Sequence, residues 1–138
     1  MIVFPGNRID GKVTINGARG FVRAIGDRMD LTLECIRRHY LDLDSPLADV
    51  IERYDDFFTL FGDFAGYVSF FLLDDLVDED LAVKFFMNFD DFRGPAIPRD
   101  LATYQEYQRR SLDFVHARND RIAQRGLRRG DDLRTSAN

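Results

Sequence analysis

The feature that most constrains this sequence is the stretch from Phe64 to Val77, FAGYVSFFLLDDLV, whose side chains leave almost no polar face. A surface helix pairs an apolar stripe with a polar opposite face, whereas a helix that is apolar nearly all round is buried. The pattern therefore predicts a helix from Asp63 to about Val77 at the centre of the fold. Residues 67–73 are also rich in side chains that favour strands, so a strand stays open as an alternative.

Three further helices are predicted from apolar side chains that recur every three or four residues. The first covers residues 27–41 and has basic side chains in its last turn, where they suit the helix dipole. The second covers residues 46–61, because Ser45 is a typical cap and proline is favoured directly after it. The last covers residues 101–125 and starts after Asp100, another good cap.

Short strands are predicted at residues 1–4 and 81–87, with a third fragment around residues 13–15. The expected fold class is therefore α+β, mainly helical, with about four helices and two or three short strands. Residues 1–125 are expected to form one globular domain. Residues 126–138 are polar and predict a mobile tail.

The composition restricts the class of protein. A chain of 138 residues with 45% hydrophobic residues is long enough for one domain with its own core. Cys35 is the only cysteine, so no internal disulfide forms and a reducing, cytoplasmic location is expected. No apolar run reaches the ~18 residues of a membrane span, and no signal peptide is recognisable at the start. Two histidines are too few for a zinc site of the usual type.

Charge is unevenly distributed along the chain. Residues 41–100 hold fifteen acidic and four basic side chains, whereas basic residues are in excess on both sides of this segment. We expect the acidic middle to pack among the basic ends; an acidic surface for a basic partner is the alternative. Nucleic acid is not favoured as a partner, although the last helix carries a basic flank: Arg110, Arg118, Arg121, Arg125 and Arg128.

The sequence Asp74-Asp75-Leu76-Val77-Asp78 resembles the aspartate-rich metal-diphosphate motif of isoprenoid synthases. On a helix, Asp74 and Asp78 share a face and Asp75 neighbours both, which suits magnesium. However, the chain has about half the length of such enzymes and holds no second motif of this spacing. We therefore expect no metal at Asp74, Asp75 and Asp78, and no cofactor elsewhere.

The favoured ligand site is the glycine-rich stretch Asn16-Gly17-Ala18-Arg19-Gly20 with the arginines that follow it. Glycines let backbone N–H groups approach an anion, and a guanidinium binds phosphate or carboxylate with two parallel hydrogen bonds. An anionic small molecule is therefore expected at Asn16, Gly17, Arg19, Arg23 and Arg28. A surface turn without a ligand is the structural alternative.

The chain is expected to be a binding or interaction domain that uses this anion site. The alternative is a small enzyme acting on a phosphate-bearing substrate, in which Asp30, Glu34 or His39 would transfer the proton. Cys35 and His39 are one helical turn apart, a spacing that allows a nucleophilic pair, but a buried thiol is the favoured interpretation. Enzymatic activity thus stays undecided at the level of sequence.

Several long phrases resemble an uncharacterised family of bacterial proteins, a domain of unknown function: TINGARGF, DLTLECIRRHY and GYVSFFLLDDLV. The resemblance covers about residues 2–122 and implies no activity. It implies an additional segment before Ile2 in other members, so we expect either a homodimer or a missing N-terminal piece that pairs with the first strand. It also implies Gln at the position of Asp74, which weakens the metal interpretation further.

Overall fold

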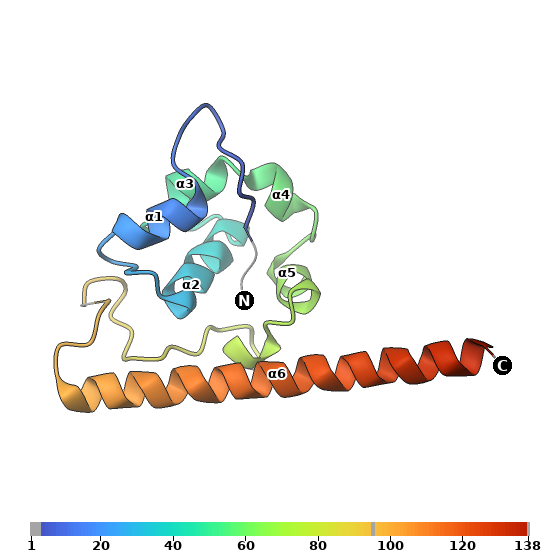
Figure 1. Ribbon diagram of the computed structural model, residues 1–138. Coiled ribbons are helices and arrows are strands. Elements are labelled where there is room, and N and C mark those ends of the chain that lie inside the picture. The colour runs from blue at the N-terminus through green and yellow to red at the C-terminus, as the bar shows by residue number, and fades with distance from the viewer. Residues whose placement is uncertain (1–3, 95, 138) are drawn as a thin grey trace.

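The computed structural model describes residues 4–94 and 96–137, with side chains described as far as residue 124. Its elements, in chain order, are α1 (Ile15–Phe21), α2 (Met29–Tyr40), α3 (Ala48–Glu52), α4 (Asp55–Thr59), α5 (Phe64–Phe70), the short 3-10 helix η1 (Asp74–Leu76) and α6 (Leu101–Ala137). Figure 1 shows α1 to α5 gathered into a body, with the long α6 lying beneath it as a separate layer.

The predicted α+β class is wrong, because the described residues form helices and no sheet. Residues 81–87 form no regular structure beyond one isolated antiparallel bridge, between Val77 and Val83. The predicted fragment at residues 13–15 instead starts α1, since Thr14 Oγ1 accepts a hydrogen bond from the Gly17 N–H at 3.1 Å. Residues 1–3 of the remaining predicted strand lie outside the described residues.

Helix α2, and not the stretch from 63 to 77, occupies the centre of the body. Seven consecutive residues of α2, from Asp30 to Ile36, are buried. The predicted central helix is shorter than expected: α5 ends at Phe70, and Leu72 then adopts φ +57°, a left-handed conformation that breaks the helix. Phe70 is largely exposed, so burial alone does not explain why this stretch is apolar.

The predicted helix at 46–61 is divided into α3 and α4. The bend at Arg53 and Tyr54 is held by the N-terminal loop: Arg53 Nη2 donates to the Val13 carbonyl at 3.0 Å, and Tyr54 Oη donates to the Asn7 carbonyl at 2.8 Å. These two bonds satisfy backbone carbonyls of a segment without regular structure. The loop thereby closes the end of the body near α3.

The core is rich in aromatic side chains. Tyr67 and Phe58 are fully buried, and their ring centroids are 5.7 Å apart. Tyr40, Phe61 and Phe71 surround Tyr67 at centroid distances between 5.0 and 6.1 Å, in tilted or edge-on arrangements that aromatic pairs prefer. This cluster joins the ends of α2, α4 and α5 into one body.

Helix α6 starts where the sequence predicts, because Asp100 Oδ1 accepts a hydrogen bond from the Thr103 N–H at 2.8 Å. It packs on the body through Tyr107 and Phe114, which contact Phe86 of the segment between η1 and α6. The helix continues to Ala137, beyond the expected end near residue 125. The proposed division into a domain at 1–125 and a tail at 126–138 stays a prediction, since side chains from residue 125 lie outside the description.

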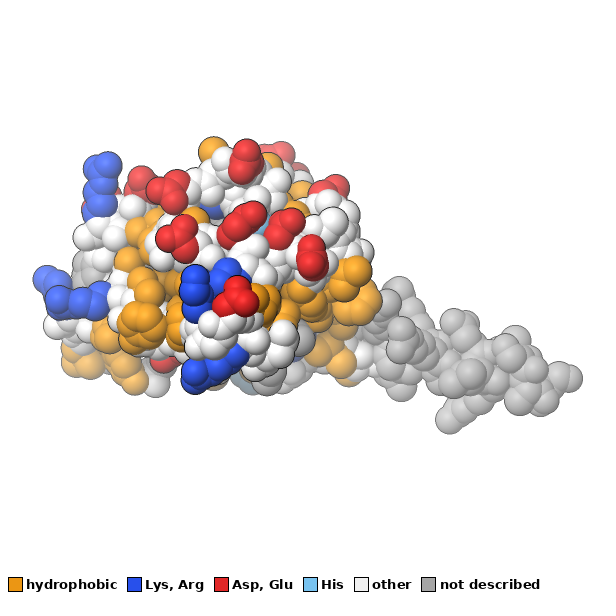
Figure 2. Space-filling view, turned by 90° about the horizontal axis from the view of Figure 1, so that it is seen from above, with side chains coloured by type: hydrophobic (Ala, Val, Ile, Leu, Met, Phe, Trp, Pro, Cys, Tyr) orange, Lys and Arg blue, Asp and Glu red, His pale blue; other side chains and the backbone are white. Residues whose placement is uncertain are grey.

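Charged side chains of the acidic middle partly pair with the basic ends. Arg121 of α6 binds Asp75 with Nη2 at 2.7 Å, and Arg38 of α2 binds Asp91 at 2.7 Å. Many other acidic side chains stay exposed, and Figure 2 shows them spread over the face of the body that carries α3 and α4. In the part of the chain that the structure describes, no helix is long and apolar enough to cross a membrane.

Candidate functional site

The predicted anion site at the glycine-rich stretch is folded into α1. Asn16 and Gly17 occupy the first turn of this helix, where the Gly17 N–H is already bound by Thr14. A Cβ atom at Gly17 would lie 2.9 Å from Cγ2 of Val13, so close packing at the helix start accounts for this glycine. The backbone of Asn16 and Gly17 is therefore part of a capped helix.

Arg19 points into the protein. Its Nε donates to Thr32 Oγ1 at 2.8 Å, and its Nη2 donates to the Asp27 carbonyl at 2.8 Å. Its Nη1 lies 3.4 Å from the Asn16 side-chain oxygen. Partial burial lowers the pKa of Arg19, and the charge of Asp27 opposes this effect. Arg19 thus connects α1 to α2.

Arg28 is also buried, and only 5% of its surface is exposed. It forms a two-pronged ion pair with the fully buried Asp30, in which Nε donates to Asp30 Oδ1 at 3.1 Å and Nη2 donates to the second oxygen. Asp30 also accepts the Phe86 N–H at 2.8 Å, and Arg28 Nη1 donates to the Ala96 carbonyl at 3.1 Å. The pair holds Phe86 and Ala96, which belong to the chain between η1 and α6, against α2.

Arg23 is the member of the predicted set that stays exposed, and it lies at a groove with Arg93 and Arg99. We call this the arginine groove. None of the three guanidinium groups makes a hydrogen bond or salt bridge to another described residue. Arg93 acts at longer range on Asp91, whose pKa is lowered mainly by its hydrogen bond from Arg38 and to a smaller extent by the charge of Arg93. The groove therefore presents three cations to solvent.

The arginine groove has a volume of about 580 Å³, which lies in the range of small-molecule sites. Its wall is formed by the end of α1 and the turn after it on one side, and by the loop before α6 on the other. Between the cations it is lined by small and apolar residues: Gly20, Phe21, Ala24, Gly26, Gly94, Ala96, Ile97 and Pro98. An anion with an apolar portion matches both parts of this lining.

The three residues predicted for proton transfer do not meet at the groove. Asp30 is bound by Arg28, as described above, and Glu34 Oε1 accepts from Arg37 Nη1 and from Arg38 Nε, each at 3.0 Å. His39 lies at the opposite end of α2 from Asp30. Cys35 is buried, and burial raises its pKa to about 11, so the thiol is not poised as a nucleophile.

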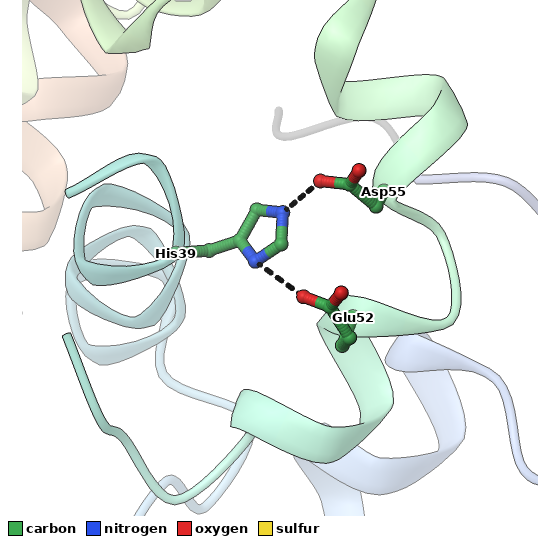
Figure 3. A group of neighbouring side chains, drawn as sticks. All are labelled: His39, Glu52 and Asp55. Carbon is green, nitrogen blue, oxygen red and sulfur yellow. Dashed lines mark hydrogen bonds and ion pairs between the residues drawn. The ribbon is translucent and has the colours of Figure 1, made fainter. Parts of the chain in front are cut away.

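His39 forms the clearest cluster of titratable groups, together with Glu52 of α3 and Asp55 of α4 (Figure 3). Its Nε2 lies 2.8 Å from Asp55 Oδ1, and its Nδ1 lies 3.6 Å from Glu52 Oε2. One candidate ligand atom from each residue lies within 4.8 Å of the others, which is short enough to consider a metal ion. However, the two carboxylates face opposite nitrogens of the ring, whereas one ion takes a single imidazole nitrogen. The ring forms one hydrogen bond, between Nε2 and Asp55, and Glu52 lies beside the other nitrogen beyond hydrogen-bond distance.

The aspartates of the resembled metal motif do not lie on one helical face. Asp75 is bound by Arg121, Asp78 Oδ1 accepts the N–H groups of Asp80 and Ala82 at 2.9 and 3.0 Å, and Asp74 is exposed in η1. The helix ends before this motif, so the one-turn spacing that would align the carboxylates is lost. Within the described residues, the three do not form a group of converging ligands.

Sequence reasoning missed Arg93 and Arg99 as candidate site residues. The signal was present in the composition, because residues 41–100 contain only four basic side chains and two of them bracket Gly-Pro-Ala-Ile-Pro. Their proximity to Arg23 comes from the contact between the Arg28 side chain and the Ala96 carbonyl. That contact joins segments 68 residues apart in the chain, which no local pattern indicates.

The comparison with protein families gives one match, to the model described as "Family of unknown function (DUF6994)", over residues 1–122. The chain belongs to this family. The resemblance stated from the sequence phrases is thereby confirmed, and DUF6994 covers all of the body and the part of α6 that packs on it. No curated protein and no solved structure matched the chain.

Proposed function

We propose that this DUF6994 domain binds an organic anion in the arginine groove. The observation that carries the proposal is that Arg23, Arg93 and Arg99 face one groove without a carboxylate partner among the described residues. Guanidinium groups bind phosphate or carboxylate oxygens with paired hydrogen bonds, and three of them neutralise a multiply charged group. The site expected at Asn16–Arg28 is thus retained only at Arg23 and is extended by two residues of the loop before α6.

The apolar lining supports a ligand that is more than a bare ion. Phe21 and Ile97 are large apolar side chains at the groove, and both are mostly exposed in the absence of a ligand. Covering such surface contributes roughly 25 cal/mol per Å². A phosphate or carboxylate attached to a flat or apolar group would therefore bind more tightly than the inorganic ion.

Binding is favoured over catalysis because the groove lacks an acid–base group. Among its described lining residues there is no Asp, Glu or His side chain. General acid–base catalysis requires such a group within hydrogen-bond reach of the reacting atom. The enzyme alternative therefore has no observation in its favour.

The test is calorimetric titration of the full chain with inorganic phosphate, with AMP and with adenosine. We expect AMP to bind more tightly than phosphate, adenosine to bind hardly at all, and salt to weaken the binding of both anions. Arg23→Ala, Arg93→Ala and Arg99→Ala should each weaken AMP binding by about tenfold or more, as the loss of one charged hydrogen bond implies.

Arg8→Ala is the matched control. Arg8 is an exposed arginine of the N-terminal loop and makes no hydrogen bond or ion pair with a described residue. The Arg8→Ala substitution removes one positive charge, as each groove variant does, but at a site outside the groove. AMP binding should therefore be unchanged. The proposal fails if neither anion binds the wild-type chain, or if Arg8→Ala weakens binding as much as the three groove variants do.

A further inference from the structure

One side of α6 packs on the body, and another side exposes a row of apolar residues. Phe114 belongs to the core and Tyr107 packs against it, whereas Tyr104, Leu112, Val115 and Ile122 are 40–54% exposed. Figure 1 shows α6 as a single layer beneath the body, so no other helix formed by the described residues covers its outer side. The exposed row is therefore an unpartnered helix face.

The row is a continuous stripe when the two exposed amides between its members are included. In order it consists of Tyr104, Gln108, Leu112, Val115, Asn119 and Ile122, which we call the α6 stripe. At 3.6 residues per turn these six positions fall within a wedge of roughly 80°. The wedge lies about 100° round the helix from the side that packs on the body. A second helix can therefore lie on the stripe beside α6.

The α6 stripe reads the same in both directions by residue class: apolar, amide, apolar, apolar, amide, apolar. An interface related by a two-fold axis must be complementary to itself, and an antiparallel helix pair inverts the order of its residues. We propose that α6 pairs antiparallel with α6 of a second copy of this chain. The two-fold axis passes between Leu112 and Val115.

In this register apolar residues face apolar residues of the partner helix, and amides face amides. Leu112 lies opposite the partner's Val115, and Tyr104 packs near the partner's Ile122. Gln108 lies opposite the partner's Asn119, where two side-chain amides donate and accept hydrogen bonds with each other. The amides also specify the register, as a polar residue in a helix seam does, because a shifted pair would place them against apolar side chains.

Charge on the flank of the stripe fits the same register. Arg109 and Asp120 lie on the side of the stripe away from the body. The Nε and Nη2 groups of Arg109 donate to Glu106 of the same helix, its Nη1 group makes no hydrogen bond to a described residue, and its side chain is 65% exposed. In an antiparallel pair the same flanks of the two helices meet, so Arg109 comes close to the partner's Asp120. The symmetry produces this opposite-charge contact twice, which favours the second copy over an unrelated partner.

The first test is the mass of the full chain in solution, measured by light scattering coupled to size exclusion. The wild-type chain is expected at twice 16.0 kDa and the Leu112→Glu variant at 16.0 kDa. Leu43→Glu is the matched control, because Leu43 is equally exposed at 53% against 54% but lies in the loop after α2. It should remain a dimer. A wild-type monomer, a dimer that survives Leu112→Glu, or a dimer broken by Leu43→Glu would each overturn the proposal.

The second test is the orientation of the pair, measured by disulfide cross-linking. A mixture of Gln108→Cys and Asn119→Cys chains should give the mixed cross-linked dimer, while each variant alone should not cross-link. In the antiparallel register two copies of position 108 are about 16 Å apart along the axis, too far for a disulfide. Cross-linking of Gln108→Cys with itself would indicate a parallel pair and refute the antiparallel one. Cys35 is buried and does not interfere.

Discussion

Asp30→Asn is the substitution that best tests how the body and the arginine groove are held together. Asp30 is 0% exposed, and its carboxylate accepts three hydrogen bonds. Two come from the Arg28 guanidinium and one from the Phe86 N–H. Asparagine has nearly the same shape and keeps one acceptor oxygen. The substitution therefore removes the charge with little change in packing, and it leaves the buried Arg28 guanidinium without its counter-ion.

The expected cost follows from the burial of both partners. Breaking a buried ion pair by removing one charge costs about 3–5 kcal/mol, since the remaining charge is uncompensated. The cation is partly compensated by the Ala96 carbonyl and by the ring of Tyr107, whose centroid lies 5.7 Å from the guanidinium carbon. We therefore expect about 3 kcal/mol, the lower end of the range, out of the roughly 5–15 kcal/mol typical of a domain.

The assay is urea unfolding of the variant followed by circular dichroism, together with AMP titration. Arg28→Met combined with Asp30→Asn should recover part of the lost stability, because it removes the stranded cation. Asp42→Asn, at an exposed loop position, is the control and should change stability by less than about 0.5 kcal/mol. AMP binding should weaken in Asp30→Asn, since Arg28 holds the Ala96 loop that carries Arg93 and Arg99. An Asp30→Asn variant as stable as the wild type would refute the reasoning.

Three smaller predictions concern other parts of the chain. Gly66→Ala should cost about 1–3 kcal/mol in chemical unfolding, because the added Cβ would lie 2.0 Å from the Phe61 carbonyl oxygen and the helix start must shift. The Arg121 hydrogen bond lowers the pKa of Asp75, so this ion pair stabilises the fold at neutral pH and is lost as pH falls through the lowered pKa. Unfolding of wild type and Asp75→Asn at pH 7 and at acid pH should differ only at pH 7, by less than about 1 kcal/mol because the pair is partly exposed. Cys35, with its pKa raised to about 11 by burial, should resist a thiol reagent at pH 8 until the protein unfolds; rapid labelling of the native chain would contradict this.

The helices whose ends are marked by local signals were predicted well from the sequence. Residues 27–41 agree closely with α2, and Asp100 caps α6 as expected. Periodicity and caps are local properties, because a helix satisfies its hydrogen bonds within the segment. The family was also recognisable from the sequence, and the match over residues 1–122 confirms it.

The predicted strands are wrong because a strand must pair with a second strand, and the local sequence does not indicate whether such a strand lies beside it. Residues 81–87 have a strand-like composition, but their backbone is satisfied by other groups: Asp30 binds the Phe86 N–H and the Leu76 carbonyl accepts the Lys84 N–H. The apolar stretch from 64 to 77 also did not form the single helix that its local pattern predicts. Its second half turns at Leu72 and packs beneath the body as η1.

The sequence by itself determined α2 and the capped start of α6, because each depends on a few neighbouring residues. Only the tertiary structure decided which arginines are buried and which are free. The local sequence does not distinguish Arg19, Arg23 and Arg28. In the structure Arg19 binds Thr32 and Arg28 binds Asp30, whereas Arg23 is exposed to solvent. The free one meets Arg93 and Arg99 because a buried ion pair fixes a distant loop beside it. Burial and long-range contact set the partner of a charged side chain, and neither is a property of the local sequence.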